Sequence, residues 1–333
     1  MSSTSLHETD FEHIPVMLSE VIEALSPALE RNSAVLYDLT LGLGGHTSAF
    51  LTEFPNILVF GVDRDYAALE RATARLSTFG PRFRGFNCRY DELNAVIAQT
   101  GCSPTAILMD LGVSSMQLDD PSRGFAYSKD EALDMRMNQS TGQTAAELIG
   151  ELEVEELASI LKEFGEEKHS GLVAQSIKKV LPTTTSQLAD AIRLGLPKQL
   201  QNTEYKMSAI KRVFQALRIA VNCELESLES ALDCALNSLE VGGRIAILTY
   251  HSLEDRIVKK RFNLGTSQHC ASLLPREIPL QNLDQLGYLD VLVKGVAPSA
   301  NEQETNPRSR SARLRVAQKT ADVNTSTQGV SNA

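Results

Sequence analysis

The stretch DLTLGLGGH, residues 38–46, is the strongest indication of the fold of this chain. It follows the apolar run AVLY at 34–37 and precedes TSAFL at 47–51, a pattern typical of a helix. A strand, a glycine-rich turn and a helix in this order bring backbone N–H groups and a helix N-terminus up to a nucleotide-like ligand. The glycines are spaced G-x-G-G, whereas the dinucleotide fingerprint is G-x-G-x-x-G. The sequence therefore predicts a nucleoside cofactor without a pyrophosphate, and S-adenosylmethionine fits that description.

Composition places the chain among ordinary globular proteins. It has 333 residues, of which 42% are hydrophobic and 22% charged, enough to bury a full core. Residues 1–12 lack the basic and apolar regions of a secretory signal, and no apolar run reaches the roughly 18 residues that cross a bilayer. The five cysteines are scattered and the six histidines show no ligand spacing. We expect a cytoplasmic protein with reduced thiols, no membrane association and no metal site.

Basic residues are concentrated in two places, although the formal net charge is −10. The net charge argues against a protein that coats free nucleic acid, because phosphate contacts need lysine and arginine. The two clusters comprise Arg256, Lys259, Lys260 and Arg261, and then Arg308, Arg310, Arg313, Arg315 and Lys319. Either cluster alone would indicate only a solvated surface.

Apolar runs and helical patterns alternate through the first third of the chain. Strands are expected at 34–39, 57–62, 82–88 and 105–110, with helices at 46–53, 66–77 and 91–98. Such alternation with short connections predicts a parallel sheet covered by helices on both faces.

The alternation of expected strands and helices ends after Asp110. Residues 132–201 show helical patterns without a strand, and one long amphipathic helix is expected at 208–239. Strands are expected again at 244–249, 289–293 and 312–317. We expect a doubly wound, Rossmann-like α/β sheet with an all-helical insertion after its fourth strand, where insertions hang over the ligand crevice.

This pattern divides the chain into four segments. The sheet domain is expected at 1–125 and 208–319, with the helical substrate-recognition insertion at 126–207. Residues 320–333 are rich in Thr, Ser and Asn, so a disordered tail is expected there.

Three aspartates follow expected strands. Asp38 closes the first strand, Asp63 the second and Asp110 the fourth. A carboxylate after the second strand can accept both hydroxyls of a ribose. Aspartate is common in turns, but three at these strand ends together predict a cofactor site. Two roles are open for His46. It could contact the ligand through its backbone N–H, or its imidazole could act as a general base, and the backbone contact is favoured.

Several longer motifs identify a family. They are HIPVMLSE at 13–20, DLGVSSMQLDD at 110–120 with RGF at 123–125, LDMRM at 133–137, FQALRIAVN at 214–222, YHSLEDR at 250–256 and NPRSRSARLR at 306–315. With the glycine turn, they make the chain similar to the RsmH (MraW) family of bacterial 16S ribosomal RNA cytosine-N(4)-methyltransferases. The resemblance covers about residues 11–318.

The resemblance implies a class I S-adenosylmethionine-dependent methyltransferase fold. It implies methyl transfer to the exocyclic amine of a cytosine in the decoding centre of 16S rRNA, within the assembled 30S subunit. The cofactor-binding positions carried over by motif are Gly44, Gly45, His46, Asp63, Tyr90, Asp110 and Gln117. Tyr90 stands where the family usually carries Phe, which keeps the ring and adds a hydroxyl. A homodimer is an alternative that the sequence leaves open.

The sequence leaves several candidates for the catalytic group. DNA amine methyltransferases carry an N/D/S-P-P-Y/F/W motif after the fourth strand, and this chain has none. Asp110, Ser114 and His251 are candidates to accept the amine proton, with water as the alternative acceptor. Ser114 has an equally weighted interpretation as a helix cap, and Ser252 is the expected cap of the helix after the fifth strand.

RNA contact is expected from the two basic clusters, chiefly from Arg256, Lys259, Arg308, Arg310 and Arg313. Two other classes of protein remain as alternatives. A nicotinamide-dependent oxidoreductase would share the fold but carry G-x-G-x-x-G. A non-catalytic RNA-binding module would be expected to lose the glycine turn, Asp63 or Asp110, and all are present.

Overall fold

The computed structural model describes residues 15–127, 129–200, 202–272 and 287–322. Within these ranges one sheet has the strand order β3-β2-β1-β4-β5-β7-β6. Its strands are β1 (Val35–Asp38), β2 (Leu58–Asp63), β3 (Phe83–Asn87), β4 (Ala106–Asp110), β5 (Arg244–Thr249), β6 (Leu289–Val296) and β7 (Arg313–Lys319). The first five strands run parallel, and β7 is antiparallel to both β5 and β6.

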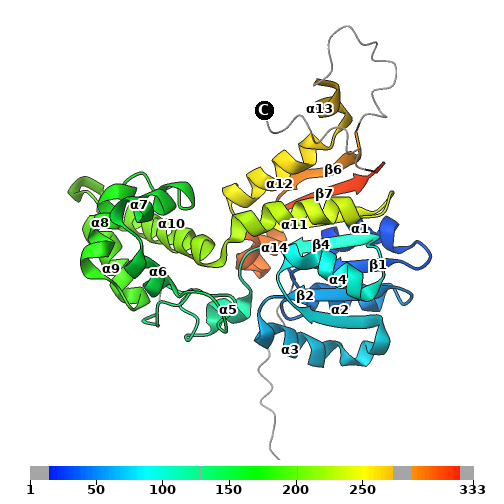
Figure 1. Cartoon of the computed structure of the whole chain (residues 1–333), viewed down its shortest axis with the longest axis horizontal. Helices are drawn as coiled ribbons and strands as arrows, with labels where there is room; N and C mark the ends of the chain where they lie inside the picture. The colour runs from blue at the N-terminus through cyan, green and yellow to red at the C-terminus, as the bar shows by residue number, and fades with distance from the viewer. Residues whose placement is uncertain (1–14, 128, 201, 273–286, 323–333) are drawn as a thin grey trace, which may run out of the picture.

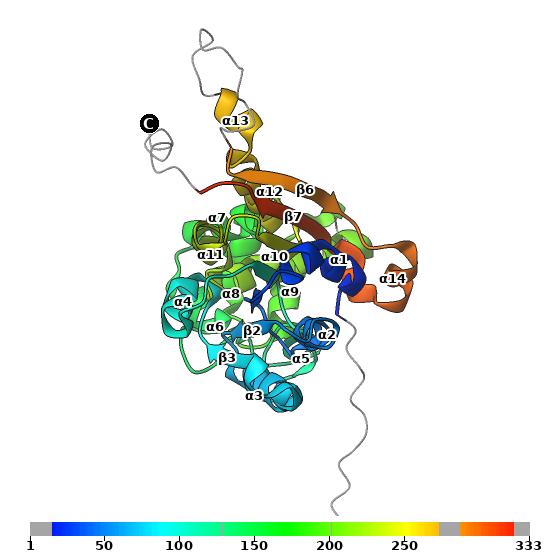
Figure 2. The same cartoon turned by 90° about the vertical axis from the view of Figure 1, so that its right-hand side faces the viewer.

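Helices cover both faces of the sheet (Figure 2). One face packs against α1 (Leu18–Leu29), α2 (Gly45–Glu53) and α3 (Tyr66–Leu76), and the other against α4 (Leu93–Thr100), α11 (Glu224–Ser238) and α12 (Ser252–Leu264). Adjacent strand residues point to opposite faces, so Ile245 and Ile247 of β5 belong to one core and Ala246 and Leu248 to the other. The expected doubly wound sheet is confirmed.

The insertion lies between β4 and β5 and has a hydrophobic core of its own (Figure 1). Its helices are α5 (Ser115–Asp119), α6 (Ala145–Glu151), α7 (Val154–Glu163), α8 (Ser170–Val180), α9 (Thr185–Gly195) and α10 (Thr203–Asn222). Side chains of α10 such as Val213, Phe214 and Leu217 pack in this core. The expected boundary at 208 thus falls inside α10, which packs with the insertion.

The single helix expected at 208–239 is wrong. The structure has two helices, α10 and α11, separated at Cys223, whose φ of 49° is left-handed. A left-handed residue ends an α-helix because the backbone can no longer continue the i to i−4 hydrogen bonds. The hydrophobic spacing runs through the break without interruption, which is why periodicity alone missed it.

Two short helices complete the C-terminal part, α13 (Ser267–Ser272) and α14 (Ala300–Thr305). Most of the expected tail, from 323 onward, lies outside the described residues. Of the helices that are described, none combines the length and apolar character needed to span a membrane.

Candidate active site

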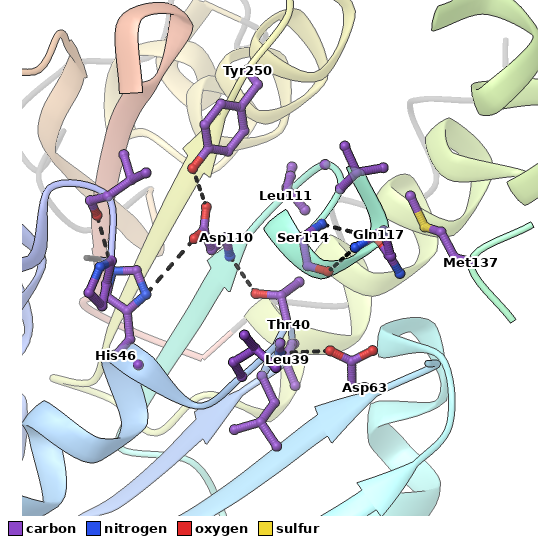
Figure 3. A pocket seen from close by; sticks show the side chains of 18 of the residues that line it. Leu39, Thr40, His46, Asp63, Asp110, Leu111, Ser114, Gln117, Met137 and Tyr250 are labelled. Atoms are coloured by element: carbon purple, nitrogen blue, oxygen red, sulfur yellow. Dashed lines mark hydrogen bonds and ion pairs between the residues drawn. The ribbon is translucent and has the colours of Figure 1, made fainter. Parts of the chain in front are cut away.

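A cavity of about 300 Å³ lies at the carboxyl ends of β1, β2 and β4. The glycine turn after β1, the ends of β2 and β4, and the segment that leads into α5 contribute lining residues (Figure 3). Met137 and Arg218 reach it from the insertion. The cavity therefore lies where open α/β sheets bind their ligands.

Asp63, the last residue of β2, forms a hydrogen bond with the glycine turn that follows β1. The backbone N–H of Gly42 donates to Asp63 Oδ2 at 2.7 Å, and the N–H of Asp65 donates to Asp63 Oδ1 at 2.8 Å. Burial raises the pKa of Asp63 to about 6, although these two hydrogen bonds oppose the shift. Asp63 lines the cavity with a carboxyl group already oriented by backbone donors.

The two glycines at the start of α2 are required by close contacts. Gly44 has a φ of 73°, and a Cβ there would lie 2.9 Å from Leu76 Cδ1. A Cβ on Gly45 would lie 2.7 Å from Pro15 Cγ. Only glycine gives the turn this conformation with the N-terminal segment packed so closely. Gly45 lines the cavity, whereas Gly44 lies outside its lining and packs against Leu76 of α3.

Asp38 does not line the cavity, although the sequence places it beside Asp63 and Asp110. Its side chain is buried and accepts a hydrogen bond from Thr47 Oγ1 at 2.7 Å. Burial raises its pKa. Asp38 therefore connects β1 to α2 and acts on the ligand site only through the position of that helix.

His46 is buried beside the cavity, 7% exposed. Its Nε2 lies 3.0 Å from the carbonyl oxygen of Val16, so Nε2 carries the proton and donates. The other ring nitrogen, Nδ1, lies 3.9 Å from Asp110 Oδ2 (Figure 3). Burial lowers the pKa of His46, which favours the neutral ring.

Asp110 is the most perturbed acid that faces the cavity. The hydroxyl of Tyr250 donates to Asp110 Oδ1 at 2.6 Å, and the N–H of Asp110 donates to Thr40 Oγ1 at 2.5 Å. Burial raises the pKa of Asp110 to about 7, while the hydrogen bond from Tyr250 lowers it. A carboxyl group with this pKa can take up and release a proton near neutral pH.

Tyr250 was not among the expected site residues, although it lies in one of the quoted motifs. It lines the cavity directly after β5, the neighbour of β4 in the sheet. The signal that could have found it is its position, because parallel neighbouring strands end at the same edge.

Ser114 and Gln117 form a reciprocal cap at the start of α5. Gln117 N–H donates to Ser114 Oγ at 3.3 Å, and Ser114 N–H donates to Gln117 Oε1 at 3.0 Å. Gln117 Nε2 also donates to Asp65 Oδ2 at 3.0 Å. Both residues line the cavity, and the hydroxyl of Ser114 is used as a helix cap.

Tyr90 lines the cavity on the side of β3. Its hydroxyl donates to the carbonyl oxygen of Glu224 at 3.1 Å, and burial raises its pKa. The added hydroxyl therefore has a partner, and the ring remains available to the ligand.

His251 lies outside the lining of the cavity. It caps α12, so the expected cap at Ser252 is wrong by one residue. Its Nε2 lies 3.1 Å from Glu254 Oε1, and Glu224 stands close enough to form a group that could hold a metal ion. Arg218 already binds both carboxylate oxygens of Glu224 at 2.9 Å, which balances this charge, and we assign no ion there.

The expected RNA-contact residues lie in α12, in residues 307–311 and at the start of β7. Arg256 of α12 pairs with Glu166 at 3.1 Å, and Arg308 pairs with Asp119 of α5 at 2.9 Å. Both pairs connect the C-terminal part of the sheet domain to the insertion segment. Lys259, Arg310 and Arg313 are exposed. Of the five, only Arg308 lines the cavity.

Comparison with known proteins gives the following matches. A family model described as the MraW methylase family matches residues 10–320. A protein of Beutenbergia cavernae named Ribosomal RNA small subunit methyltransferase H is 45% identical over 314 residues, covering 92% of each chain. A protein of Frankia alni with the same name is 43% identical over 316 residues, covering 93% of this chain and 95% of the other.

Solved structures align more distantly. An rRNA methylase from Streptococcus thermophilus is 12% identical, with a TM-score of 0.39 and coverage of 90% of this chain and 96% of that one. A structure described as a putative methyltransferase from Streptococcus mutans in complex with SAH is also 12% identical, with a TM-score of 0.40 and coverage of 92% and 99%. The family assignment rests on the sequence matches.

Proposed function

The chain belongs to the MraW methylase family, and from this membership we propose that it methylates the exocyclic N(4) amine of a cytosine in 16S rRNA. The proposed methyl donor is S-adenosylmethionine, and the proposed substrate is the assembled 30S subunit. The observation that carries the proposal is the position of Asp110, a carboxyl group with a pKa of about 7 in the cavity beside the glycine turn.

The residues present fit the donor. The proposed cofactor-binding set is Gly44, Gly45, His46, Asp63, Tyr90, Asp110 and Gln117, and all except Gly44 line the cavity. The absence of a Cβ on Gly45 keeps the turn open, and Asp63 is placed to accept ribose hydroxyls. Bound there, S-adenosylmethionine supplies a methyl group on a positively charged sulfur, which carboxyl groups nearby would stabilise.

Transfer forms a bond between the amine nitrogen and the methyl carbon and breaks the methyl–sulfur bond, whose electron pair stays on sulfur. The amine must also lose a proton. The ionised Asp110 carboxylate is proposed to accept it through Oδ2, because Oδ1 accepts the hydrogen bond of Tyr250. Most of the rate is expected from alignment of the two reactants.

Ser114 and His251 are weaker candidates for this proton. The hydroxyl of Ser114 caps α5, and His251 lies outside the cavity lining and beside Glu254. Water remains the alternative acceptor. We retain Asp110 as the proposed group.

RNA binding is proposed to use local basic residues on a protein of net charge −10. Lys259, Arg310 and Arg313 are exposed, whereas Arg256 and Arg308 would exchange their present carboxylate partners for phosphate. From a ribosomal substrate we propose a cytoplasmic location. A homodimer stays a prediction, which sedimentation velocity of the purified protein would test.

The test is methyl transfer from labelled S-adenosylmethionine to 30S particles that lack the modification, followed by mapping of the modified nucleotide. The expected result is label on N(4) of one cytosine of 16S rRNA. Label on another atom or RNA, or no transfer, would contradict the proposal. Calorimetry with S-adenosylmethionine and with NAD separates a methyltransferase from an oxidoreductase of the same fold.

A further inference from the structure

Glu254 is a buried acid on the first turn of α12. It is 3% exposed, and it lies outside the lining of the cavity described above. Two other glutamates stand at the same third position of a helix, Glu147 of α6 and Glu156 of α7, and both are exposed. A buried carboxylate loses its hydration, so it stays ionised only where groups of the protein replace the water. The partners of Glu254 therefore indicate its role.

The carboxylate of Glu254 holds the segment that connects β5 to α12. The N–H of Tyr250 donates to Glu254 Oε2 at 2.8 Å, and the N–H of His251 donates to the same oxygen at 3.3 Å. The other oxygen, Oε1, lies 3.1 Å from His251 Nε2. Both oxygens are thus used by residues that come directly before α12, and they fix the backbone position of Tyr250.

The surroundings of Glu254 favour its ionised form. Burial raises its pKa, but the ring of His251 and the charge of Arg218 outweigh burial, so the net pKa lies below the usual value. Arg218 in turn binds both carboxylate oxygens of Glu224, each at 2.9 Å. Glu254 therefore carries a negative charge at neutral pH.

Tyr250 connects this acid to the cavity. Its N–H is bound to Glu254, and its hydroxyl donates to Asp110 Oδ1 at 2.6 Å (Figure 3). A tyrosine side chain turns about only two torsions, which occupy a few rotamers, so the position of its backbone largely determines where its hydroxyl lies. The three residues thus form one chain of contacts from α12 to the end of β4.

We propose that Glu254 is a positioning residue for methyl transfer, which holds the backbone of Tyr250 so that the tyrosine hydroxyl meets Asp110. The inference rests on the proposed function and adds to it a residue that touches neither reactant. With Oδ1 of Asp110 bound to Tyr250, Oδ2 is left to take the amine proton. No bond forms or breaks at Glu254, and no proton is transferred to it.

The charge of Glu254 also acts on Asp110. The titratable groups that act on Asp110 are Asp38 at the end of β1, His46 of α2, Tyr250 after β5 and Glu254 of α12. Burial is the main cause of the raised pKa of Asp110, and the negative charge of Glu254 raises it further. Loss of that charge should lower the pKa of Asp110, whereas loss of the Tyr250 hydroxyl should raise it.

The first test is a double-mutant cycle of Glu254→Ala and Tyr250→Phe. The kcat is measured on unmodified 30S particles at saturating S-adenosylmethionine, at a pH above the acidic limb of the rate profile, where Asp110 is ionised in every variant. Glu254→Ala should lower kcat about threefold to tenfold, the effect of one lost hydrogen bond. In a protein that already lacks the hydroxyl, the same substitution should lower kcat by less than about twofold, because Glu254 acts through that hydroxyl.

Two results of this cycle would overturn the inference. One is a kcat of Glu254→Ala equal to that of wild type, and the other is full multiplication of the two effects, which a general loss of helix stability would give. Calorimetric affinity for S-adenosylmethionine should stay near the wild-type value, because Glu254 does not line the cavity. The matched control is Glu147→Ala. It removes the same kind of cap from α6, a carboxylate that accepts the N–H of Thr144 at 2.8 Å, and should leave kcat unchanged.

The second test uses Glu254→Gln, which keeps an oxygen for the N–H of Tyr250 and removes the charge. The variant has nearly the same size as the original residue, so it decides the matter if the alanine variant does not fold. Its kcat above the acidic limb should stay within about twofold of wild type, since the hydrogen bond to Tyr250 is kept. Its acidic limb should move to lower pH, whereas Tyr250→Phe should move the limb to higher pH. An unmoved limb, or one that moves to higher pH, would overturn the inference.

The inference and the proposed function fail in different ways. If wild type transfers no methyl group to a cytosine N(4), the proposed function fails. If wild type transfers it while Glu254→Ala keeps the wild-type kcat, or while its effect multiplies with that of Tyr250→Phe, the function stands and Glu254 is only a helix cap.

Discussion

Asp110 and Tyr250 are joined by the shortest hydrogen bond between two side chains that line the cavity, 2.6 Å. Burial raises the pKa of Asp110 and the Tyr250 hydroxyl partly offsets the shift, with a net value of about 7. The burial of Asp110 and its hydrogen bond with Tyr250 cannot be seen in the sequence. Both depend on the folded chain, and Tyr250 is 140 residues away. At the scale of single residues, the structure thus adds a hydrogen-bonding partner and a raised pKa to a residue that the sequence had already offered as a proton acceptor.

Tyr250→Phe should move the pH dependence of kcat. Loss of the hydroxyl removes a hydrogen bond that lowers the pKa of Asp110, so the pKa should rise above about 7 and the acidic limb should shift to higher pH. Activity near neutral pH should fall accordingly. The profile is measured on 30S particles at saturating S-adenosylmethionine. Tyr37→Phe is the control, because that buried hydroxyl bonds to Cys102 O at 2.8 Å, outside the cavity lining. An unchanged profile in Tyr250→Phe would remove Asp110 from its proposed role.

Asp110→Asn should lower the activity and raise the free energy of unfolding. Burial raises the folded-state pKa from its ordinary 3.8 to about 7, so the folded state binds the proton more tightly than the unfolded chain. The stability that the protonated group contributes is present below pH about 4 and is lost as the pH rises to about 7.

The variant cannot ionise, so its free energy of unfolding should exceed that of wild type by about 4 kcal/mol at pH 8 and match it near pH 4. Urea unfolding at the two pH values measures the difference. Asp290→Asn, on the exposed side of β6, is the control and should show no such dependence. An equal gain at both pH values would contradict a raised pKa.

At the scale of secondary-structure elements, the break between α10 and α11 is fixed by contacts with two other segments. Asn222, the last residue of α10, accepts from the N–H of Met137 and donates to Met135 O, both at 2.8 Å. Arg64, which follows β2, donates to Asn222 O at 3.1 Å. These three contacts fix the end of α10 against residues 135–137 and the segment that follows β2.

Cys223→Gly should stabilise the protein by about 0.5–1 kcal/mol. A left-handed φ of 49° destabilises a residue with a Cβ by about 1–2 kcal/mol. Glycine has no such strain, but its unfolded chain has more conformational entropy, which cancels part of the gain. Denaturant unfolding at fixed pH measures the change. Cys223→Ala keeps the Cβ and should leave stability unchanged, whereas Cys223→Val should lower it. Equal stability in the glycine and valine variants would show that the backbone strain is absent.

The elements themselves were largely predictable. The strand–turn–helix pattern at 34–51 and the apolar runs located every strand of the described sheet to within a few residues. The break at Cys223 was not predictable, because no proline or glycine marks it and the hydrophobic spacing continues on both sides. Its cause is tertiary, since the contacts of Asn222 come from two other segments.

At the scale of the whole molecule, opposite charges join the sheet domain to the insertion. The pairs of Arg256 with Glu166 and Arg308 with Asp119 are largely exposed, so each contributes little to stability. Because the pairs contribute little, both arginines could leave their carboxylate partners and bind phosphate with little loss in the free energy of unfolding.

Lys259→Ala should lower the salt dependence of binding to 30S particles. Each lysine that neutralises a phosphate contributes about 0.7–0.9 to the slope of log K against log salt, so the slope should fall by about that amount. Binding is measured between low and moderate potassium chloride. Lys179→Ala, an exposed lysine of α8, serves as the control. An unchanged slope would place Lys259 outside the RNA interface.

From the amino-acid sequence alone one can predict the sheet, the insertion after β4, the family and the seven residues proposed to hold the cofactor. These follow from local patterns and motifs, which consecutive residues encode. Three features are visible only once the chain is folded: Asp38 supports α2, Tyr250 binds Asp110, and Arg218 of α10 lines the cavity. The physical reason is that burial and hydrogen bonding depend on neighbours far apart along the chain, and folding alone brings them together.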